Sequence, residues 1–96
     1  MIMMNVLRNR RYEILDLAGR HGATNVRVFG SAARGDSDDR SDIDLLVEMQ
    51  PGRSLLDMGG LLMDLQRLLG RRIDIVTERG LRARIRERVL REAVPL

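Results

Sequence analysis

Two aspartates separated by one residue, Asp42 and Asp44, are the clearest chemical feature of the 96-residue sequence. They lie in an alternating segment, residues 41–48, where every second side chain of a β-strand projects to the same face with Cα atoms roughly 6.5 Å apart. Two carboxylates at that spacing repel each other, and aspartate is a poor strand former, so packing alone does not select the pair. Mg²⁺ prefers oxygen ligands and is held by one or two carboxylates together with substrate phosphates. The pair therefore predicts a magnesium site.

A glycine and a serine, Gly30 and Ser31, stand between another alternating segment and two alanines. This order is typical of a turn from a strand into a helix, which offers backbone N–H groups and a hydroxyl to a phosphate. A helix-capping serine would leave the same pattern. Arg34 either reaches triphosphate oxygens or secures the following loop by pairing with Asp36 or Asp39. The turn precedes the metal pair by about a dozen positions, which favours a site that holds the triphosphate of a nucleotide.

Asp74 lies in a third alternating segment, residues 71–77. If this strand lies beside the strand of Asp42 and Asp44, Asp74 completes a three-carboxylate metal site. Its expected role is then that of a general base, which takes the proton of an acceptor hydroxyl or orients the hydroxyl at one metal ion. The alternative is a surface acid of the strand with no catalytic role.

The elements that must position these residues follow from hydrophobic periodicity. Helical spacing predicts long helices over residues 5–20, 53–69 and 81–94, and a short helix that Gly35 ends. Alternation predicts strands over residues 25–29, 41–48 and 71–77, the first two antiparallel. In the 53–69 helix, Ser54 is the expected cap and Gly59-Gly60 marks a tight backbone contact or a kink, while Pro95 is expected to end the last helix. The expected core stripe of the 53–69 helix is Leu55, Leu56, Met58, Leu62, Leu65 and Leu69.

This order of elements, with no linker or repeat, predicts one mixed α+β domain over residues 1–96, with about three strands flanked by about four helices. The absence of cysteine excludes disulfide scaffolds and thiolate metal sites. The apolar runs are too short to span a bilayer, and the N-terminal residues resemble no secretory signal, so a cytoplasmic protein without membrane contact is expected.

Charge is unevenly distributed along the chain. The net charge of +3 comes from 17 arginines and no lysine against 14 acids, but residues 36–48 reverse it with one arginine and six acids. Only Tyr12 and Phe29 could stack on bases, so no direct contact with nucleic acid is expected. The arginines of the C-terminal helix form either a solvated face or a docking surface for an acidic partner.

The residues around both motifs resemble a known family. The run Gly30-Ser31-Ala32-Ala33-Arg34-Gly35, followed by Ser41-Asp42-Ile43-Asp44-Leu45-Leu46-Val47, is similar to the G-S-x-x-R-G and S-D-x-D signature of the DNA polymerase beta nucleotidyltransferase superfamily. It is most similar to the minimal nucleotidyltransferases, which are small prokaryotic catalytic domains. The resemblance includes the lead-in Val26-Arg27-Val28-Phe29, the segment LGRRIDIV from Leu69 and the C-terminal REAVPL.

The resemblance implies specific roles. It implies a single minimal nucleotidyltransferase domain in which Asp42 and Asp44 bind Mg²⁺, Gly30 and Ser31 contact phosphate, and Asp74 is the third carboxylate. It also implies transfer of AMP from ATP to a tyrosine hydroxyl of a HEPN-domain ribonuclease toxin, so that the protein acts as an antitoxin.

Two other functions remain open on the sequence. A non-catalytic antitoxin would neutralise the toxin by binding, with the arginine-rich helices as its interface. Transfer to a small molecule such as an aminoglycoside is disfavoured because 96 residues contain no apparent acceptor-binding domain. The acceptor site is therefore expected to need another chain, and a homo- or hetero-oligomer is expected.

Overall fold

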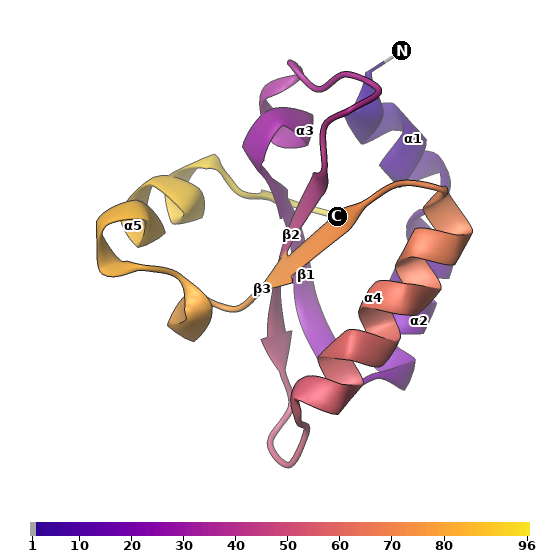
Figure 1. The fold of residues 1–96 in the computed structure, drawn as a ribbon, viewed down its shortest axis with the longest axis vertical. Coiled ribbons are helices and arrows are strands. Elements are labelled where there is room, and N and C mark those ends of the chain that lie inside the picture. Colours follow the sequence, from indigo (N-terminus) through magenta and orange to yellow (C-terminus); the bar gives the residue numbers. More distant parts are fainter. Residues whose placement is uncertain (1) are drawn as a thin grey trace.

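A mixed β-sheet forms the centre of the protein (Figure 1). The computed structural model describes residues 2–96. Within this range the sheet has four strands in the order β3-β2-β1-β4. The strands are β1 (Ala23–Phe29), β2 (Ile43–Met49), β3 (Ile73–Val76) and the two-residue β4 (Val94–Pro95). The expected mixed α+β class is confirmed, with one strand more than the periodicity indicated.

Helices cover the two faces of the sheet unequally (Figure 1). The helices are α1 (Met3–Asn9), α2 (Arg11–Arg20), α3 (Gly30–Arg34), α4 (Leu55–Leu69) and α5 (Ala83–Glu92), with a 3-10 turn over Glu78–Gly80. The main core joins α1, α2 and α4 to one face of the sheet, where Ile43, Leu45 and Val47 are buried. A smaller cluster on the other face packs Leu46 against α5. None of the helices in residues 2–96 is long and apolar enough to cross a membrane.

The expected helix over residues 5–20 is two helices. The chain breaks at Arg10, whose backbone leaves the helical region and whose guanidinium donates to the Leu68 carbonyl of α4 at 3.2 Å. Apolar spacing continues across a one-residue break, so periodicity alone could not reveal it.

Helix α4 begins and ends as its sequence predicts. The Ser54 hydroxyl accepts from the Leu56 amide, and the Asp57 carboxylate accepts from the Ser54 amide, which forms a capping box. Gly70 ends the helix in the left-handed conformation.

The expected core stripe of α4 is wrong at its start. Leu55 and Leu56 are 83% and 88% exposed, and the fully buried positions of the helix are Leu61 and Leu65. The first turn of α4 lies at the end of the molecule near the 50–54 loop (Figure 1), where the core has ended. Helical spacing of apolar residues continues in the part of α4 that lies beyond the core. The spacing therefore could not show where the core ends.

The C-terminal segment also differs from expectation. The last helix starts at Ala83 and ends at Glu92, and Val94–Pro95 then pairs with β1 as an edge strand. Pro95 therefore lies in a strand and is not the residue that ends the helix. An edge strand tolerates proline because one side of its backbone needs no hydrogen-bond partner.

Strand pairing brings the sequence motifs to one end of the sheet. β1 and β2 are antiparallel, as expected, and β2 and β3 are parallel. The last residue of β1, Phe29, is the register partner of Asp44, and α3 follows β1 directly. The turn of Gly30 and the acids of β2 and β3 therefore lie at the same end of the sheet.

Candidate active site

Asp44 and Asp74 lie side by side on neighbouring strands. Each is the second residue of its strand, and the parallel register pairs them directly. Alternation turns both away from the main core, to the face that Leu46 and Val76 share. Asp44 is half-buried and Asp74 is exposed. The condition set for Asp74 from the sequence, that its strand lies beside the strand of Asp44, is met.

Burial and neighbouring acids perturb Asp44. Desolvation, followed by repulsion from Asp74 and then from Asp42, raises its pKa from 3.8 to about 6, against a smaller opposing effect of Arg34. Asp44 and Asp74 form no ion pair with any residue in 2–96. The negative charge at this end of the sheet is therefore only partly compensated by protein cations.

Asp42 takes a different position from the other two acids. It precedes β2, is exposed, and its Oδ1 lies 3.1 Å from Nε of Arg72. In the described range 2–96, no three acidic or histidine side chains are arranged closely enough to hold an ion together. Asp44 thus has Asp74 directly beside it on the sheet, while the Asp42 carboxylate is paired with an arginine.

The turn at Gly30 is built around the Asp44 carboxylate. Gly30 has a φ of +70°, and a Cβ at this position would overlap Oδ2 of Asp44. Only glycine meets both conditions, since it adopts positive φ without penalty and has no side chain. The Gly30 amide donates to Oε1 of Glu92 at 2.6 Å. Ser31 follows, partly buried, as the second residue of α3.

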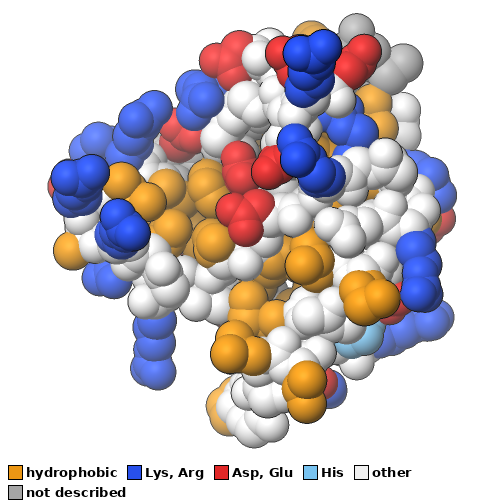
Figure 2. Space-filling view, in the orientation of Figure 1, with side chains coloured by type: hydrophobic (Ala, Val, Ile, Leu, Met, Phe, Trp, Pro, Cys, Tyr) orange, Lys and Arg blue, Asp and Glu red, His pale blue; other side chains and the backbone are white. Residues whose placement is uncertain are grey.

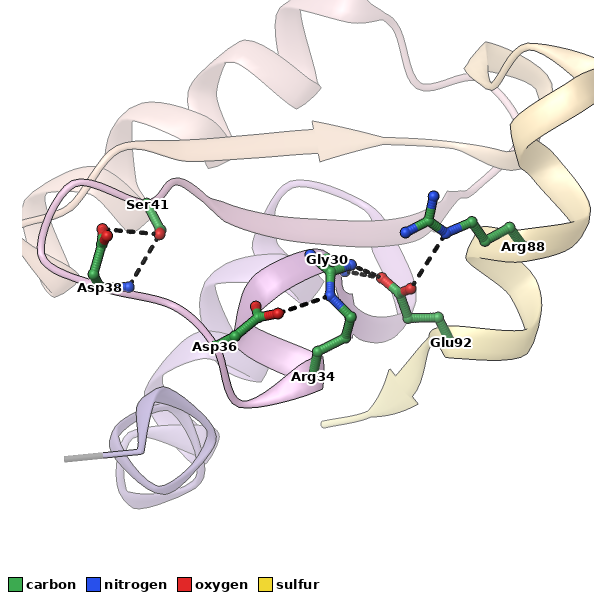
Figure 3. A network of polar contacts seen from close by, with 7 residues as sticks. All are labelled: Gly30, Arg34, Asp36, Asp38, Ser41, Arg88 and Glu92. Atoms are coloured by element: carbon green, nitrogen blue, oxygen red, sulfur yellow. Dashed lines mark hydrogen bonds and ion pairs between the residues drawn. The ribbon is translucent and has the colours of Figure 1, made fainter.

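Arg34 is engaged by protein carboxylates (Figure 3). Its Nε lies 3.3 Å from Asp36 Oδ2 and its Nη1 lies 2.9 Å from Glu92 Oε1. The pairing with Asp36 is one of the two roles that the sequence allows for Arg34, and the pairing with Glu92 was not anticipated. Helix α3 then ends at Gly35 in the left-handed conformation, as the sequence indicates.

The loop between α3 and β2 is held by local and distant contacts. The Asp38 carboxylate accepts from the Ser41 hydroxyl at 3.1 Å and from the Arg40 amide at 2.9 Å. From the segment between α4 and β3, Nη2 of Arg71 donates to the carbonyls of Asp38 and Ser41, each at 2.7 Å. The backbone immediately before Asp42 is therefore tied to the strand of Asp74.

Two residues of this region were missed from the sequence. Arg71 lies 30 or more positions from the two residues whose carbonyls it binds, and Glu92 lies 62 positions from Gly30 and 58 from Arg34. Nothing in the sequence distinguishes Arg71 among the 17 arginines, or Glu92 from Glu87 in the same helix. No local pattern marks such contacts, although the REAVPL segment that contains Glu92 formed part of the family resemblance.

On the surface, acidic side chains gather near the middle of the face shown in Figure 2, between arginines and a band of apolar atoms. This arrangement agrees with the reversal of charge over residues 36–48. An electronegative centre beside cations is suited to a bound polyanion together with a divalent cation.

The paired carboxylates, the glycine turn and the mixed sheet define a nucleotidyltransferase. Residues 12–96 match the family described as nucleotidyltransferase domain, and the chain belongs to it.

Individual proteins agree with this assignment. The protein adenylyltransferase MntA of Thermococcus cleftensis is 40% identical over 79 residues, which are 82% of this chain and 80% of that protein. A solved structure described as a minimal nucleotidyltransferase is 56% identical, with a TM-score of 0.88 over 100% of this chain and 97% of that one. A toxin-antitoxin structure with AMP-PNP shares the fold, with a TM-score of 0.74 at 21% identity, over 88% of this chain and 69% of that one.

Proposed function

We propose that this nucleotidyltransferase transfers AMP from ATP to a hydroxyl of a partner protein, a tyrosine of a HEPN-domain toxin, and so acts as an antitoxin. The observation that carries the proposal is the direct pairing of Asp44 with Asp74 beside the Gly30 turn. The name of the Thermococcus relative supports protein adenylylation, and the toxin-antitoxin structure with AMP-PNP supports the nucleotide and the kind of partner.

The acids fit a hard divalent cation. Asp44 and Asp74 present carboxylate oxygens from adjacent strands. The raised pKa of Asp44 reflects first its burial and then the charge of the neighbouring acids, which a cation would neutralise. Asp42 would join them after its carboxylate leaves Arg72. When bound by Asp42, Asp44 and Asp74, Mg²⁺ would supply Lewis-acid stabilisation of the charge that develops on the phosphate oxygens.

The remaining roles belong to the chain itself. The amide and hydroxyl of Ser31 would bind phosphate oxygens of ATP, while Gly30 leaves room for the Asp44 carboxylate. Asp74, the exposed member of the pair, would accept the proton of the acceptor hydroxyl. The acceptor oxygen then bonds to the α-phosphorus, the bond to the β-phosphate oxygen breaks, and pyrophosphate leaves.

Arginines away from this site supply a surface for the partner. Arg79, Arg82 and Arg84 are exposed, and none forms an ion pair with another residue in 2–96. Arginine is favoured at protein interfaces because its guanidinium pairs bidentately with carboxylates. These residues are the expected contact for an acidic region of the toxin, in a hetero-oligomer that completes the acceptor site.

Transfer of radiolabel tests the activity. Incubation of the protein with ATP labelled at the α-phosphate, Mg²⁺ and the candidate toxin should label the toxin. The Asp42→Ala, Asp44→Ala double variant should transfer no label, and Asp39→Ala, in the same acidic segment of the chain, should transfer as the wild type does. Label transfer equal in the double variant and the wild type would contradict the proposal.

Toxin neutralisation separates this function from simple binding. A catalytic antitoxin loses protection in the double variant, whereas a non-catalytic antitoxin keeps it. Toxin assays that still show neutralisation by a folded double variant would therefore favour the binding alternative.

A further inference from the structure

Glu92 reaches into the active site from the last position of α5. Its side chain is 16% exposed although it carries a carboxylate. Oε1 accepts from the Gly30 amide at 2.6 Å and lies 2.9 Å from Nη1 of Arg34, while Oε2 lies 3.8 Å from Nε of Arg88 (Figure 3). Charge-assisted contacts of this kind are stronger than neutral hydrogen bonds.

The two short contacts of Glu92 hold the first and the last residue of α3. Gly30 begins the helix and Arg34 ends it. A five-residue helix is not stable by itself, because nucleation costs more than so few hydrogen bonds return. The carboxylate of Glu92, which is 62 positions after Gly30 in the chain, therefore fixes the whole turn relative to α5.

The same contacts place the turn against Asp44. Gly30 lies so close to the Asp44 carboxylate that a Cβ there would overlap it. The negative charge of Glu92 is also near enough to contribute to the raised pKa of Asp44. Any displacement of the Gly30 backbone would change the space available to Asp44 and the direction of the Ser31 amide.

We propose that Glu92 is a positioning residue for nucleotide binding, which holds the Gly30–Arg34 turn in the geometry that receives the phosphates of ATP. The inference rests on the phosphate role of this turn in the proposed function. Glu92 does not contact the nucleotide in this assignment. It acts through the Gly30 amide and the Arg34 guanidinium.

The change in charge and the change in geometry predict opposite effects of Glu92→Gln on the affinity for nucleotide. Removal of a negative charge near a triphosphate would by itself strengthen nucleotide binding. Loss of the charged clamp would loosen the turn and weaken binding. The direction of the change therefore separates a positioning role from simple electrostatic repulsion.

The experiment measures the dissociation constant of AMP-PNP with Mg²⁺ by calorimetry, with the thermal unfolding midpoint measured on the same samples. Glu92→Gln should raise the dissociation constant about tenfold or more, because the loss of one charge-assisted contact corresponds to a change of that size. The variant should stay folded. Glu87→Gln is the matched control, because Glu87 is on the same helix and pairs with Arg91 at 2.9 Å but is far more exposed. It should bind as the wild type does.

A second variant and a direct probe complete the test. Glu92→Asp keeps the charge but is shorter by one methylene, so it should also weaken binding. Hydrogen exchange of the Gly30 amide should be slow in the wild type and faster in both variants. Unchanged or tighter binding in Glu92→Gln, or loss of folding in both variants, would overturn the positioning role. A wild-type protein that fails to bind AMP-PNP would instead overturn the proposed function itself.

Discussion

Asp44 and Asp74 are direct register partners on the parallel strands β2 and β3, so two carboxylates lie next to each other at one end of the sheet. Parallel pairing fixes this proximity through the backbone, independently of side-chain rotamers. The proximity of the acids disfavours the charged form of Asp44, whose pKa rises to about 6 because of burial and of repulsion from Asp74 and Asp42.

Replacement of Asp44 by asparagine should stabilise the metal-free protein at pH 8. A raised pKa means that this carboxyl favours the folded state at low pH, and that its contribution is lost as the pH rises from 3.8 through about 6. The full difference corresponds to about 3 kcal/mol, and solvent screening of this half-buried group reduces it to about 1–2 kcal/mol. Urea unfolding should show the gain at pH 8 and a smaller gain at pH 5.

Asp39→Asn provides the control for that measurement. Asp39 lies in the same acidic segment but is exposed in the loop, and its replacement should change stability by less than about 0.5 kcal/mol. An Asp44→Asn protein that is less stable than the wild type at pH 8 would show that the acidic cluster carries no electrostatic cost.

Gly30→Ala should impair both stability and transfer. The left-handed backbone costs a non-glycine residue about 1–2 kcal/mol, and the added Cβ overlaps the Asp44 carboxylate. Displacement of the carboxylate that we propose as a metal ligand should reduce transfer about tenfold or more. Gly35→Ala is the matched control, because Gly35 also has positive φ but open space around it. It should lose similar stability and retain activity, and equal activity losses in both variants would contradict the role of the overlap.

Arg71→Ala should loosen the loop before Asp42. The guanidinium donates to two loop carbonyls at 2.7 Å, and hydrogen bonds from a charged group contribute about 1.5–3 kcal/mol each at most. We expect a lower free energy of unfolding, faster hydrogen exchange in residues 38–42 and reduced transfer. Arg67→Ala, on the exposed side of α4, should leave all three unchanged. Unaltered exchange in the Arg71 variant would refute the loop-holding role.

The adjacent glycines of α4 should respond to alanine in opposite directions. A Cβ at Gly59 meets open space, so Gly59→Ala should gain about 0.5–1 kcal/mol of helix propensity. A Cβ at Gly60 would lie 2.8 Å from the ring of His21, which Asp64 holds at 2.7 Å. Gly60→Ala must displace that ring and should destabilise the protein. Thermal unfolding of the two variants measures the difference, and equal gains in both would disprove the contact.

The local features of this protein were readable from its sequence. The strand of Asp44, the Gly30-Ser31 turn and the capping box at Ser54 depend on residues that are adjacent or a few positions apart, and their physical requirements leave few alternatives. The expected start of that strand at Ser41 is wrong, because β2 begins at Ile43 and Asp42 lies before it, paired with Arg72. The tight backbone contact expected at Gly59-Gly60 is present at Gly60. The exclusion of thiolate chemistry likewise followed from composition alone.

Tertiary structure decided which distant residues meet. The parallel register made Asp44 and Asp74 neighbours, and the path of α5 brought Glu92 to Gly30 and Arg34. It also decided that Leu55 and Leu56 are exposed, because the first turn of α4 passes beyond the core. Periodicity determines which face of an element is apolar, but not where the neighbouring elements end or which charged side chain arrives from the far end of the chain.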